Sequence, residues 1–475
     1  MSNRVLLVGL DFGTTTSCAV VASATVVCNA ATGRVELTEF QTELPSEPVF
    51  TPWLENALDE TSLARLLDTW LAPVDRQRVL GGGAIITGLA AAQANAPAFA
   101  RLIRERLQDT VIAIAEDPCL ESWLAFMGNC DDLSRTIPQR TIVNLDIGGG
   151  TTNLAAGQNG EVSSTGSLFV GARHVQVTPG TYQIRGLSPY AEALLGELGI
   201  DKAPGDELSP AEIRAIVEWY LALLEDAVSG KSVAPHDAVR AMHQQVAFRW
   251  PENASDPLVT FSGGVGQLVY GARKSQSLPP TTAFGDLGID LARGIVESPF
   301  WRRHLDAVQP TTLGRATVYG LLRYNTQISG NTIFVGDPTL LPCADLLVLG
   351  TIRSDGSPSE IDRQIGLASR AAHGACWQVE LIGQPADAIR LLAAKLHRAL
   401  AAHSFTAERP LVLLVKENLG KVLGQYITDW GASPQPLVVI DEIEPRDVQF
   451  AHLGALRQGF VPVSFYGMNP AGGST

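Results

Sequence analysis

One motif occurs twice in this chain, each time in a turn between two apolar runs. The first copy reads Asp-Phe-Gly-Thr at 11–14 and lies between the apolar runs 5–10 and 18–27. The second begins at Asp146, reads Asp-Ile-Gly-Gly-Gly-Thr-Thr and lies within the segment 141–156. Apolar runs joined by a short glycine-containing turn predict β-hairpins. A single such string is more often an ordinary β-turn, but its recurrence in the same architecture indicates two related domains.

A third glycine-rich turn follows another short apolar run. Residues 258–261 predict a buried strand, and the string Ser-Gly-Gly-Val-Gly at 262–266 leads from it into a helix. Elsewhere strand-like and helix-like segments alternate, which is typical of an α/β protein. The string Ser-Pro-Ala-Glu at 209–212 supplies an N-cap, a proline at the first helical position and a capping-box glutamate. It therefore predicts a helix that reaches about residue 228.

The three turns carry the groups that a nucleoside triphosphate needs. Backbone N–H groups bind phosphate oxygens, and carboxylates hold magnesium, often through water. Glycines let the backbone approach the phosphates, and threonines add hydroxyl donors. The predicted nucleotide-binding residues are Gly13, Thr14, Thr15, Gly148, Gly149, Gly150, Thr151, Thr152, Gly263, Gly264 and Gly266. The predicted catalytic residues are Asp11 and Asp146, which we also expect to hold the hydrated magnesium ion; either one could instead orient the attacking water.

The length of 475 residues allows roughly three units of domain size. We expect a first domain over 1–138 with the first phosphate loop, and a second over 139–298 with the second phosphate loop and the glycine-rich turn at 262–266. We call this third turn the adenosine loop, because it would approach the adenosine side of the nucleotide. The remainder, 299–475, is predicted to be an α/β region. Its pattern fits either a further unit or a return of the chain to the first domain.

Composition argues against several classes of protein. The formal net charge of −14 disfavours general binding to nucleic acid or to an anionic membrane surface, because both need clustered Lys and Arg. No apolar run approaches the ~20 residues that span a bilayer, and the N-terminal run is too short for a signal peptide. The six cysteines form no Cys-x-x-Cys pair, so neither a disulfide framework nor a zinc site is predicted. We therefore expect a folded cytoplasmic protein.

The three turns resemble the nucleotide motifs of the superfamily that contains actin, sugar kinases and heat-shock chaperones. Residues 9–18 look like its first phosphate motif, 145–151 like its second and 258–266 like its adenosine motif. The resemblance implies two ribonuclease-H-like domains around a cleft that binds ATP and Mg²⁺. It also implies helices that cross between the domains, and the segments 121–126 and 285–296 match them.

Longer strings are similar to one branch of that superfamily, the reactivating factors of ethanolamine ammonia-lyase. These strings are Gly82–Gly88, Pro118–Ser122, Val143–Gly148, Phe261–Gly266, Gly285–Gly288, Arg315–Val318 and Ile328–Thr332. They are spread over most of the chain and are more specific than the phosphate loops. The sequence differs from the pattern of these factors at two places, and both differences bear on partner contacts rather than on the ATP site. Leu89 stands where an acidic residue is expected, and Tyr-Asn-Thr at 324–326 stands where a His-Thr pair is usual.

The family resemblance implies an ATP-dependent, chaperone-like factor that exchanges damaged cobalamin out of the lyase. Its partners would be ethanolamine ammonia-lyase and ATP, with association to an ethanolamine-utilisation microcompartment. Hydrolysis needs aligned phosphates, a metal and an oriented water rather than covalent chemistry by the protein. Besides Asp146, the acids Glu116 and Asp117 are candidates for positioning that water.

Two other classes would use the same motifs. A small-molecule kinase needs a catalytic base directed at a substrate hydroxyl, and no kinase-specific acid motif stands between the two phosphate loops. A filament-forming actin-like ATPase needs self-complementary surfaces, which one sequence does not display. A homo-oligomer of another kind stays open for the same reason.

Overall fold

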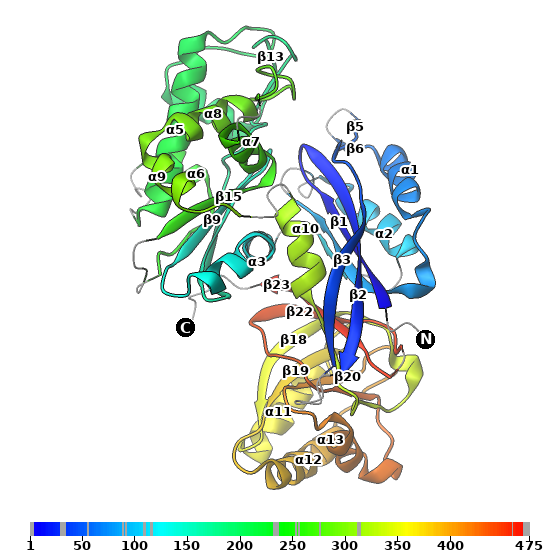
Figure 1. Cartoon of the computed structure of the whole chain (residues 1–475). Helices are drawn as coiled ribbons and strands as arrows, with labels where there is room; N and C mark the ends of the chain where they lie inside the picture. Colours follow the sequence, from blue (N-terminus) through cyan, green and yellow to red (C-terminus); the bar gives the residue numbers. More distant parts are fainter. Residues whose placement is uncertain are drawn as a thin grey trace.

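The computed structural model forms three main β-sheets with helices packed against them (Figure 1). The residues that it describes are 4–28, 35–54, 57–87, 90, 93–107, 111–114, 117–230, 237–251, 254, 257–274, 277–310, 315–457 and 459–468. Within these residues no helix is long and apolar enough to cross a membrane, and none of the six cysteines forms a disulfide.

The first domain is built on a sheet with the strand order β3-β2-β1-β7-β8. Its strands are β1 (Arg4–Phe12), β2 (Thr16–Cys28), β3 (Val35–Pro45), β7 (Val79–Ile86) and β8 (Val111–Ile114), and β4 (Val49–Phe50) pairs with the start of β2. The other elements are β5 (Trp53–Leu54), β6 (Ala57–Leu58), α1 (Glu60–Leu71), η1 (Arg76–Arg78) and α2 (Ala96–Arg106). The first three strands are antiparallel, whereas β7 and β8 run parallel to β1. One face of the sheet packs on α1 and α2 through Leu63, Leu67 and Phe99.

The second domain has a related sheet with the strand order β14-β11-β10-β9-β15, in which one parallel strand follows β9 and an antiparallel strand, β14, is added beside β11. Its strands are β9 (Ile142–Ile147), β10 (Thr152–Gln158), β11 (Glu161–Leu168), β14 (Gln244–Val246) and β15 (Leu258–Ser262), beside the hairpin of β12 (Val175–Val177) and β13 (Ile184–Leu187). Its helices are α4 (Pro189–Glu197), α5 (Pro210–Val228), α6 (Ala238–Met242), α7 (Gly263–Arg273), α8 (Gly288–Glu297) and α9 (Pro299–Ala307). Strands β9 to β11 are antiparallel, and β15 runs parallel to β9. Two antiparallel-then-parallel sheets of this kind confirm the predicted pair of ribonuclease-H-like domains around a cleft.

Two short-range predictions about the elements are also confirmed. Each Asp-x-Gly turn joins two antiparallel strands, β1 to β2 and β9 to β10. Helix α5 begins after Ser209, whose hydroxyl accepts the N–H of Glu212 while the Glu212 carboxylate accepts the N–H of Ser209. This capping box satisfies two of the N–H groups that a helix start leaves unpaired.

The helices between the domains differ in part from the prediction. They are α3 (Pro118–Thr136), α10 (Ala316–Gly320) and the π-helix η4 (Leu321–Asn325). Helix α3 contains the predicted segment 121–126 and packs against α10 (Figure 1). The other predicted crossing segment, 285–296, is wrong, because α8 packs on α5, α7 and α9 inside the second domain. Helices α3 and α10 approach so closely that a Cβ on Gly128 would collide with the carbonyl oxygen of Ala316.

The C-terminal region combines the two alternatives that its sequence pattern left open. Residues 316–325 return to the first domain, where Val318 and Leu322 pack with Leu7 on the face of the sheet opposite α1 and α2. Residues 326–468 form a further α/β unit. The exact domain bounds 1–138, 139–298 and 299–475 stay a prediction.

This third unit is a mixed sheet of order β16-β23-β22-β18-β19-β20-β21-β17. Its strands are β16 (Thr326–Ile328), β17 (Phe334–Val335), β18 (Cys343–Arg353), β19 (Ala375–Glu380), β20 (Leu411–Val415), β21 (Leu437–Ile440), β22 (Val448–Leu453) and β23 (Pro462–Met468). Its helices are η5 (Pro338–Leu340), α11 (Pro358–Ala368), α12 (Pro385–Ala402), α13 (Gly420–Ile427) and η6 (Asp429–Gly431). The four central strands β18 to β21 are parallel, and α11 to α13 cover one face.

Candidate functional site

A cavity of about 560 Å³ lies between the two Asp-x-Gly hairpins. Its wall is formed by both hairpins, by α7 along most of its length, and by the N-terminal ends of α3 and α10. The predicted residues that line it are Asp11, Gly13, Thr14, Thr15, Asp146, Gly148, Gly149, Gly150, Thr151, Gly263 and Gly264. Two predicted residues lie behind the wall. The Thr152 hydroxyl donates to the carbonyl of Val170, and Gly266 packs against the backbone of Phe261.

The first phosphate loop is held from behind by its carbonyl groups. Thr51 donates its backbone N–H to the carbonyl of Thr15 (2.9 Å) and its hydroxyl to the carbonyl of Gly13 (2.7 Å). The indole N–H of Trp53 donates to the carbonyl of Thr14 (3.1 Å). These contacts direct three successive carbonyls away from the cavity, as a loop that binds an anion requires. The buried Oγ1 of Thr15 has no hydrogen-bond partner among the described residues.

The second phosphate loop is fixed in the same manner by residues 172–174. The backbone N–H groups of 172 and 173 donate to the carbonyls of Gly148 (3.1 Å) and Gly149 (2.7 Å). The ring Nε2 of His174 lies 2.8 Å from the carbonyl oxygen of Gly150. In the part of the chain that the structure describes, the backbone N–H groups of Gly149 and Gly150 donate to no protein acceptor. The loop therefore presents donors to the cavity while its carbonyls are bound elsewhere.

His174 is a support of this loop that the sequence analysis missed. Burial, and secondarily the nearby His243, lower the pKa of His174 to about 4, so its ring is neutral at physiological pH. Because a carbonyl can only accept, the proton must lie on Nε2, facing Gly150. The other ring nitrogen, Nδ1, is then an acceptor for the hydroxyl of Ser188, 2.7 Å away. A lone histidine without a motif gave no signal of this role.

The two phosphate loops face each other at close range. A Cβ built on Gly149 would collide with the side chain of Thr15 in the opposite loop, and the same Cβ would lie 3.5 Å from the Cβ of Arg173. Position 149 therefore requires glycine because the two hairpins approach each other closely there, and not only because of the conformation of the turn. The two loops are positioned to hold one ligand from both sides.

Three carboxyl groups converge on the cavity: Asp11 at the end of β1, Asp146 at the end of β9 and Glu121 in the first turn of α3. Burial, and secondarily the Asp146 charge, raise the pKa of Asp11 from 3.8 to about 7. Burial, followed by the charges of both aspartates, raises the pKa of Glu121 well above its usual value, although hydrogen bonds from Asn153 and Thr87 oppose the shift. Like charges that raise one another's pKa favour a cation between them.

The arrangement fits a hydrated divalent ion. Among the described residues, no group of three His, Cys, Asp or Glu side chains is close enough to hold a metal directly. Mg²⁺ commonly keeps several of its waters and is held by one or two carboxylates together with phosphate oxygens. Asp11 and Asp146 are in position for such contacts through water.

Asp146 is the most firmly held of the three acids. Its Oδ1 accepts from the hydroxyl of Ser262 (2.9 Å) and its Oδ2 from the hydroxyl of Thr317 (3.1 Å). Ser262 in turn accepts from the amide of Asn144 (2.9 Å). Burial raises the pKa of Asp146, and the two hydroxyl donors counteract that effect. Thr317 was not predicted as a site residue, although it lies in the family-like string at 315–318.

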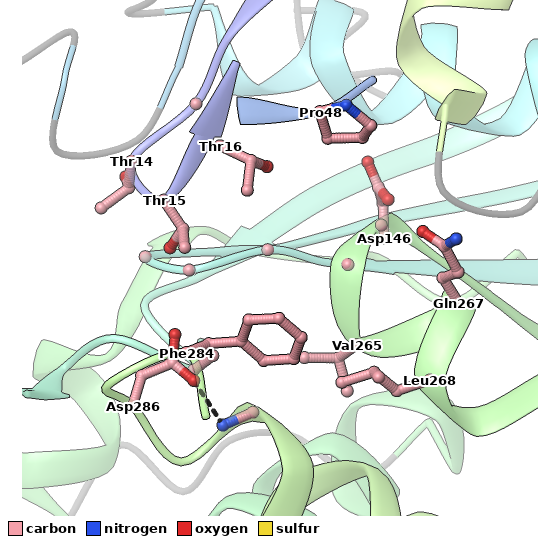
Figure 2. A pocket seen from close by; sticks show the side chains of 18 of the residues that line it. Thr14, Thr15, Thr16, Pro48, Asp146, Val265, Gln267, Leu268, Phe284 and Asp286 are labelled. Atoms are coloured by element: carbon pink, nitrogen blue, oxygen red, sulfur yellow. Dashed lines mark hydrogen bonds between the residues drawn. The ribbon is translucent and has the colours of Figure 1, made fainter. Parts of the chain in front are cut away.

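The adenosine loop starts α7 directly against the end of β9. Gly263 has φ 75°, and a Cβ there would collide with the carbonyl of Ile147 and with Oδ1 of Asp146. Beside it, Gly264 opens into free space. Figure 2 shows Val265 and Leu268 of α7 on the cavity wall, near Phe284 and Asp286 from the segment before α8. This wall is largely apolar, in contrast to the polar loops, as a site for a nucleoside requires.

Neither Glu116 nor Asp117, which the sequence suggested for positioning the water, is found among the described residues that line the cavity. Glu116 lies outside the described residues. Asp117 caps α3 by accepting the N–H of Leu120 (2.9 Å), and it also accepts the N–H of Met468 at the end of β23 (3.0 Å). Asp117 does not line the cavity, whereas Glu121, one helical turn further along α3, does. In the sequence, Glu121 lies in the predicted crossing segment 121–126 and in the family-like string Pro118–Ser122, and neither pattern indicated a role in positioning water.

A single cationic side chain, Arg315, is present among the described residues that line the cavity. Its Nη2 donates to the carbonyl of Ser46 (2.6 Å), which fixes the guanidinium beside the first hairpin. Asp286 adds a fourth carboxyl group to the three named above, so among the described lining residues Arg315 is the only cationic side chain that could offset a phosphate.

Comparison with known proteins agrees with the sequence resemblance. A family model described as "Ethanolamine utilisation protein EutA" matches residues 3–466. Two curated relatives carry the name ethanolamine ammonia-lyase reactivase EutA. One, from Salmonella typhimurium, is 28% identical over 480 residues, and the other, from Escherichia coli, is 28% identical over 478 residues; in each case 96% of both chains is covered.

The solved structures that match this chain are less similar to it than the two curated relatives are. A crystal structure of an exopolyphosphatase from Cytophaga hutchinsonii is 15% identical and has a TM-score of 0.38, covering 67% of this chain and 96% of that chain. A match over nearly the whole sequence, together with the two phosphate loops around one cavity, is decisive. The chain belongs to the ethanolamine utilisation protein EutA family.

Proposed function

We propose that this chain is an ATP-dependent reactivating factor for adenosylcobalamin-dependent ethanolamine ammonia-lyase. It would promote release of a damaged cobalamin so that intact cofactor can bind. The proposal is supported by family membership and by two full-length relatives named as reactivases of that lyase. The single observation that carries the ATP dependence is the cavity in which both phosphate loops and three carboxyl groups meet.

ATP is the proposed substrate of this cavity. Its triphosphate would lie between the two loops, where it would accept from the N–H groups of Gly149 and Gly150 and from the unpartnered hydroxyl of Thr15. Arg315 would offset part of the phosphate charge. Mg²⁺, when bound, supplies charge neutralisation on the phosphates, and Asp11 and Asp146 would hold it through water.

We assign the orientation of the attacking water to Glu121. Both oxygens of Asp146 already accept hydroxyl groups, which suits a fixed role beside the metal. Glu121 has a pKa well above its usual value and is kept in one orientation by hydrogen bonds with Asn153 and Thr87. A carboxylate whose pKa is raised accepts a proton more readily than an ordinary one.

Nucleotide-dependent motion would reach the rest of the molecule through α10. At its N-terminal end, Arg315 contacts Ser46 in the first domain, and Thr317 contacts Asp146 in the second. Helix α10 continues into η4 and then into β16 of the third unit. A change in cleft opening would thereby displace the third unit. The lyase would be met in the cytoplasm or at an ethanolamine-utilisation microcompartment.

The test uses purified ethanolamine ammonia-lyase inactivated with cyanocobalamin. The inactive lyase is incubated with this chain, ATP, Mg²⁺ and fresh adenosylcobalamin, and ethanolamine turnover is followed. Activity should return with the parent chain and ATP, and should not return without ATP or with the Asp11→Asn variant. If it stays absent with the parent chain while cofactor-free lyase regains activity from adenosylcobalamin alone, the proposed function is wrong.

A further inference from the structure

Helix α3 connects the nucleotide cavity with the third unit. Its first turn brings Glu121 into the cavity. Directly before that turn, the Asp117 carboxylate accepts the backbone N–H groups of Gly467 (2.5 Å) and Met468 (3.0 Å) at the end of β23. Strand β23 lies beside α3 (Figure 1). The third unit therefore fixes the start of the helix that carries an acid into the cleft.

Arg446, in the segment between β21 and β22, contacts α3 at a second point. Its Cζ lies 4.9 Å from the ring centroid of Trp123 on α3 and 5.5 Å from that of Phe465 on β23. The backbone of Arg446 is held by the side-chain amide of Gln378 on β19. The Arg446 N–H donates to Oε1 of that amide (2.7 Å), and the Arg446 carbonyl accepts from its Nε2 (2.8 Å). The third unit thus places this guanidinium against an aromatic ring of α3.

The same guanidinium also reaches the π-helix η4. Nη2 of Arg446 donates to the carbonyl of Tyr324 in η4 (2.7 Å). The Tyr324 hydroxyl in turn donates to Oδ2 of Asp131, further along α3 (2.8 Å). Turns of π-helix are rare and are found frequently at functional sites. Arg446 therefore contacts α3, η4 and β23 at the place where the three elements meet.

Arg446 is a cation without a carboxylate partner among the described residues. Its Nη1 is buried and has no hydrogen-bond partner in that part of the chain. Burial lowers the pKa of Arg446 to about 10, so the group is still charged at physiological pH. The two aromatic faces offset part of the cost of burying the charge, but an apolar side chain of similar volume is often as stable or more stable at such a position. Stability alone therefore does not explain an arginine here, whereas a defined orientation of α3 and η4 does.

We propose that Arg446 is a positioning residue for ATP hydrolysis, which acts through Trp123 to fix Glu121 in the cleft. This inference rests on the proposed function, in which Glu121 orients the attacking water. Trp123 and Glu121 are two residues apart on one helix, so a shift of the indole ring moves the carboxyl group as well. The two aspartates of the cleft lie on strands of the first and second domains, whereas the third unit holds Glu121 in place. A lyase that displaces the third unit would therefore change hydrolysis without touching the nucleotide.

The first test is Arg446→Met, which keeps an unbranched side chain but removes the guanidinium. Turnover at saturating ATP should fall about tenfold, because a small misplacement of a catalytic group has effects of this size or larger. The affinity for Mg-ATP, measured by calorimetry, should stay within about twofold of the parent, since no contact with the nucleotide is lost. Arg446→Lys keeps a cation between the two rings and should restore part of the turnover. The matched control is Arg398→Met, which changes an exposed arginine on α12 and should behave like the parent.

A double-mutant cycle with Glu121→Gln separates positioning from general support of the fold. In the Glu121→Gln background, Arg446→Met should cause no further loss of turnover, because the carboxyl group that it positions is absent. An equal loss in both backgrounds would overturn the proposal. Parental turnover of folded Arg446→Met would overturn it as well, and so would a loss of Mg-ATP affinity as large as the loss of turnover.

Circular dichroism establishes whether Arg446→Met is folded. If it is not, Trp123→Phe takes its place in the same cycle, because it removes the indole ring and keeps a smaller aromatic side chain on α3. The same outcomes then support or overturn the proposal. Failure of the proposed function has a different signature, namely a parent chain that hydrolyses no ATP.

Discussion

The hydroxyl of Thr317 donates a hydrogen bond of 3.1 Å to Oδ2 of Asp146, although the two residues are 171 positions apart in the sequence. This contact joins the start of α10 to the second phosphate loop. Two residues earlier, Arg315 binds the backbone of the first domain at Ser46. The N-terminal end of α10 thus touches both walls of the cleft, which makes it the element best placed to sense the distance between them.

Gly149→Val should abolish measurable binding of Mg-ATP. The new side chain would collide with Thr15 and would occupy the space in which the two loops approach a phosphate. Calorimetry with parent and variant checks this, beside circular dichroism to establish that the variant is folded. Gly196→Val, on an exposed part of α4 where a Cβ meets nothing within 4 Å, is the control and should bind as the parent does. A folded Gly149→Val protein with parental affinity would remove Gly149 from the phosphate site.

Asp11→Asn and Asp146→Asn should each lower the rate of ATP hydrolysis at least tenfold. The amide keeps the shape of the side chain but loses the charge that holds the hydrated metal. Asp146→Asn should also lower the free energy of unfolding by about 1 kcal/mol, because the hydroxyls of Ser262 and Thr317 lose a charged acceptor. ATP turnover is measured as phosphate release, and the free energy of unfolding is measured by urea titration. The two measurements separate the loss of catalysis from the loss of stability. Parental turnover in both folded variants would contradict the assignment.

Glu121→Gln should lower turnover while leaving the affinity for Mg-ATP within about threefold of the parent. A glutamine keeps hydrogen-bonding capacity toward Asn153 and Thr87 but cannot take a proton from water. Turnover is expected to fall by about 10²-fold, within the usual range for a general base. Asp117→Asn is an informative comparison, since Asp117 caps α3 and should affect stability rather than turnover. Equal turnover of parent and Glu121→Gln would leave water orientation to Asp146.

The affinity for Mg²⁺ with ATP should increase from pH 6 to pH 8. The pKa of Asp11 is raised to about 7, so its carboxyl group is largely protonated at the lower pH and must lose its proton to face a metal ion. Asp11→Asn should flatten this dependence, as measured by calorimetry at three pH values. A parent and variant with the same pH profile would show that another group is responsible.

The raised pKa of Asp11 also makes the stability of the nucleotide-free chain depend on pH. Stability should decrease as the pH rises, whereas the affinity for Mg²⁺ increases. The folded chain holds the Asp11 proton more tightly than the unfolded chain does, because the folded-state pKa lies above 3.8. The contribution to stability is present below about pH 4 and is lost as the pH rises to about 7. The free energy of unfolding of the parent should therefore fall relative to that of Asp11→Asn over this range.

Gly128→Ala should destabilise the fold by about 1–3 kcal/mol, the usual effect of overpacking. A Cβ at 128 would collide with the carbonyl oxygen of Ala316 where α3 crosses α10, and backbone cannot move aside as a flexible side chain can. Urea titration measures the change. The reference variant is Gly196→Ala, which should be neutral or stabilising because helical glycine is replaced in open space. An unchanged stability for Gly128→Ala would show that the two helices can separate at low cost.

The sequence by itself determined the local parts of this protein. The Asp-x-Gly turns between apolar runs were enough to predict both hairpins, since a short loop and its glycines restrict the backbone through nearest neighbours alone. The capping box at Ser209 likewise defined the start of α5. Their order along the chain, with the adenosine loop third, carried the superfamily resemblance that implied two domains around a cleft.

Tertiary structure decided which side chains meet in that cleft. Glu121 joins the two aspartates because the first turn of α3 enters the cavity between the domains, whereas Glu121 and Asp117 look alike as acids near a helix start. The predicted crossing segment 285–296 has the same amphipathic pattern as any core helix, so the pattern could not show that the short α10 takes that place. The hydrogen bond of Thr317 and the pairing of Phe50 with Phe284 each join separate segments of the chain. Such contacts depend on how whole sheets and helices pack, and no local pattern of residues encodes them.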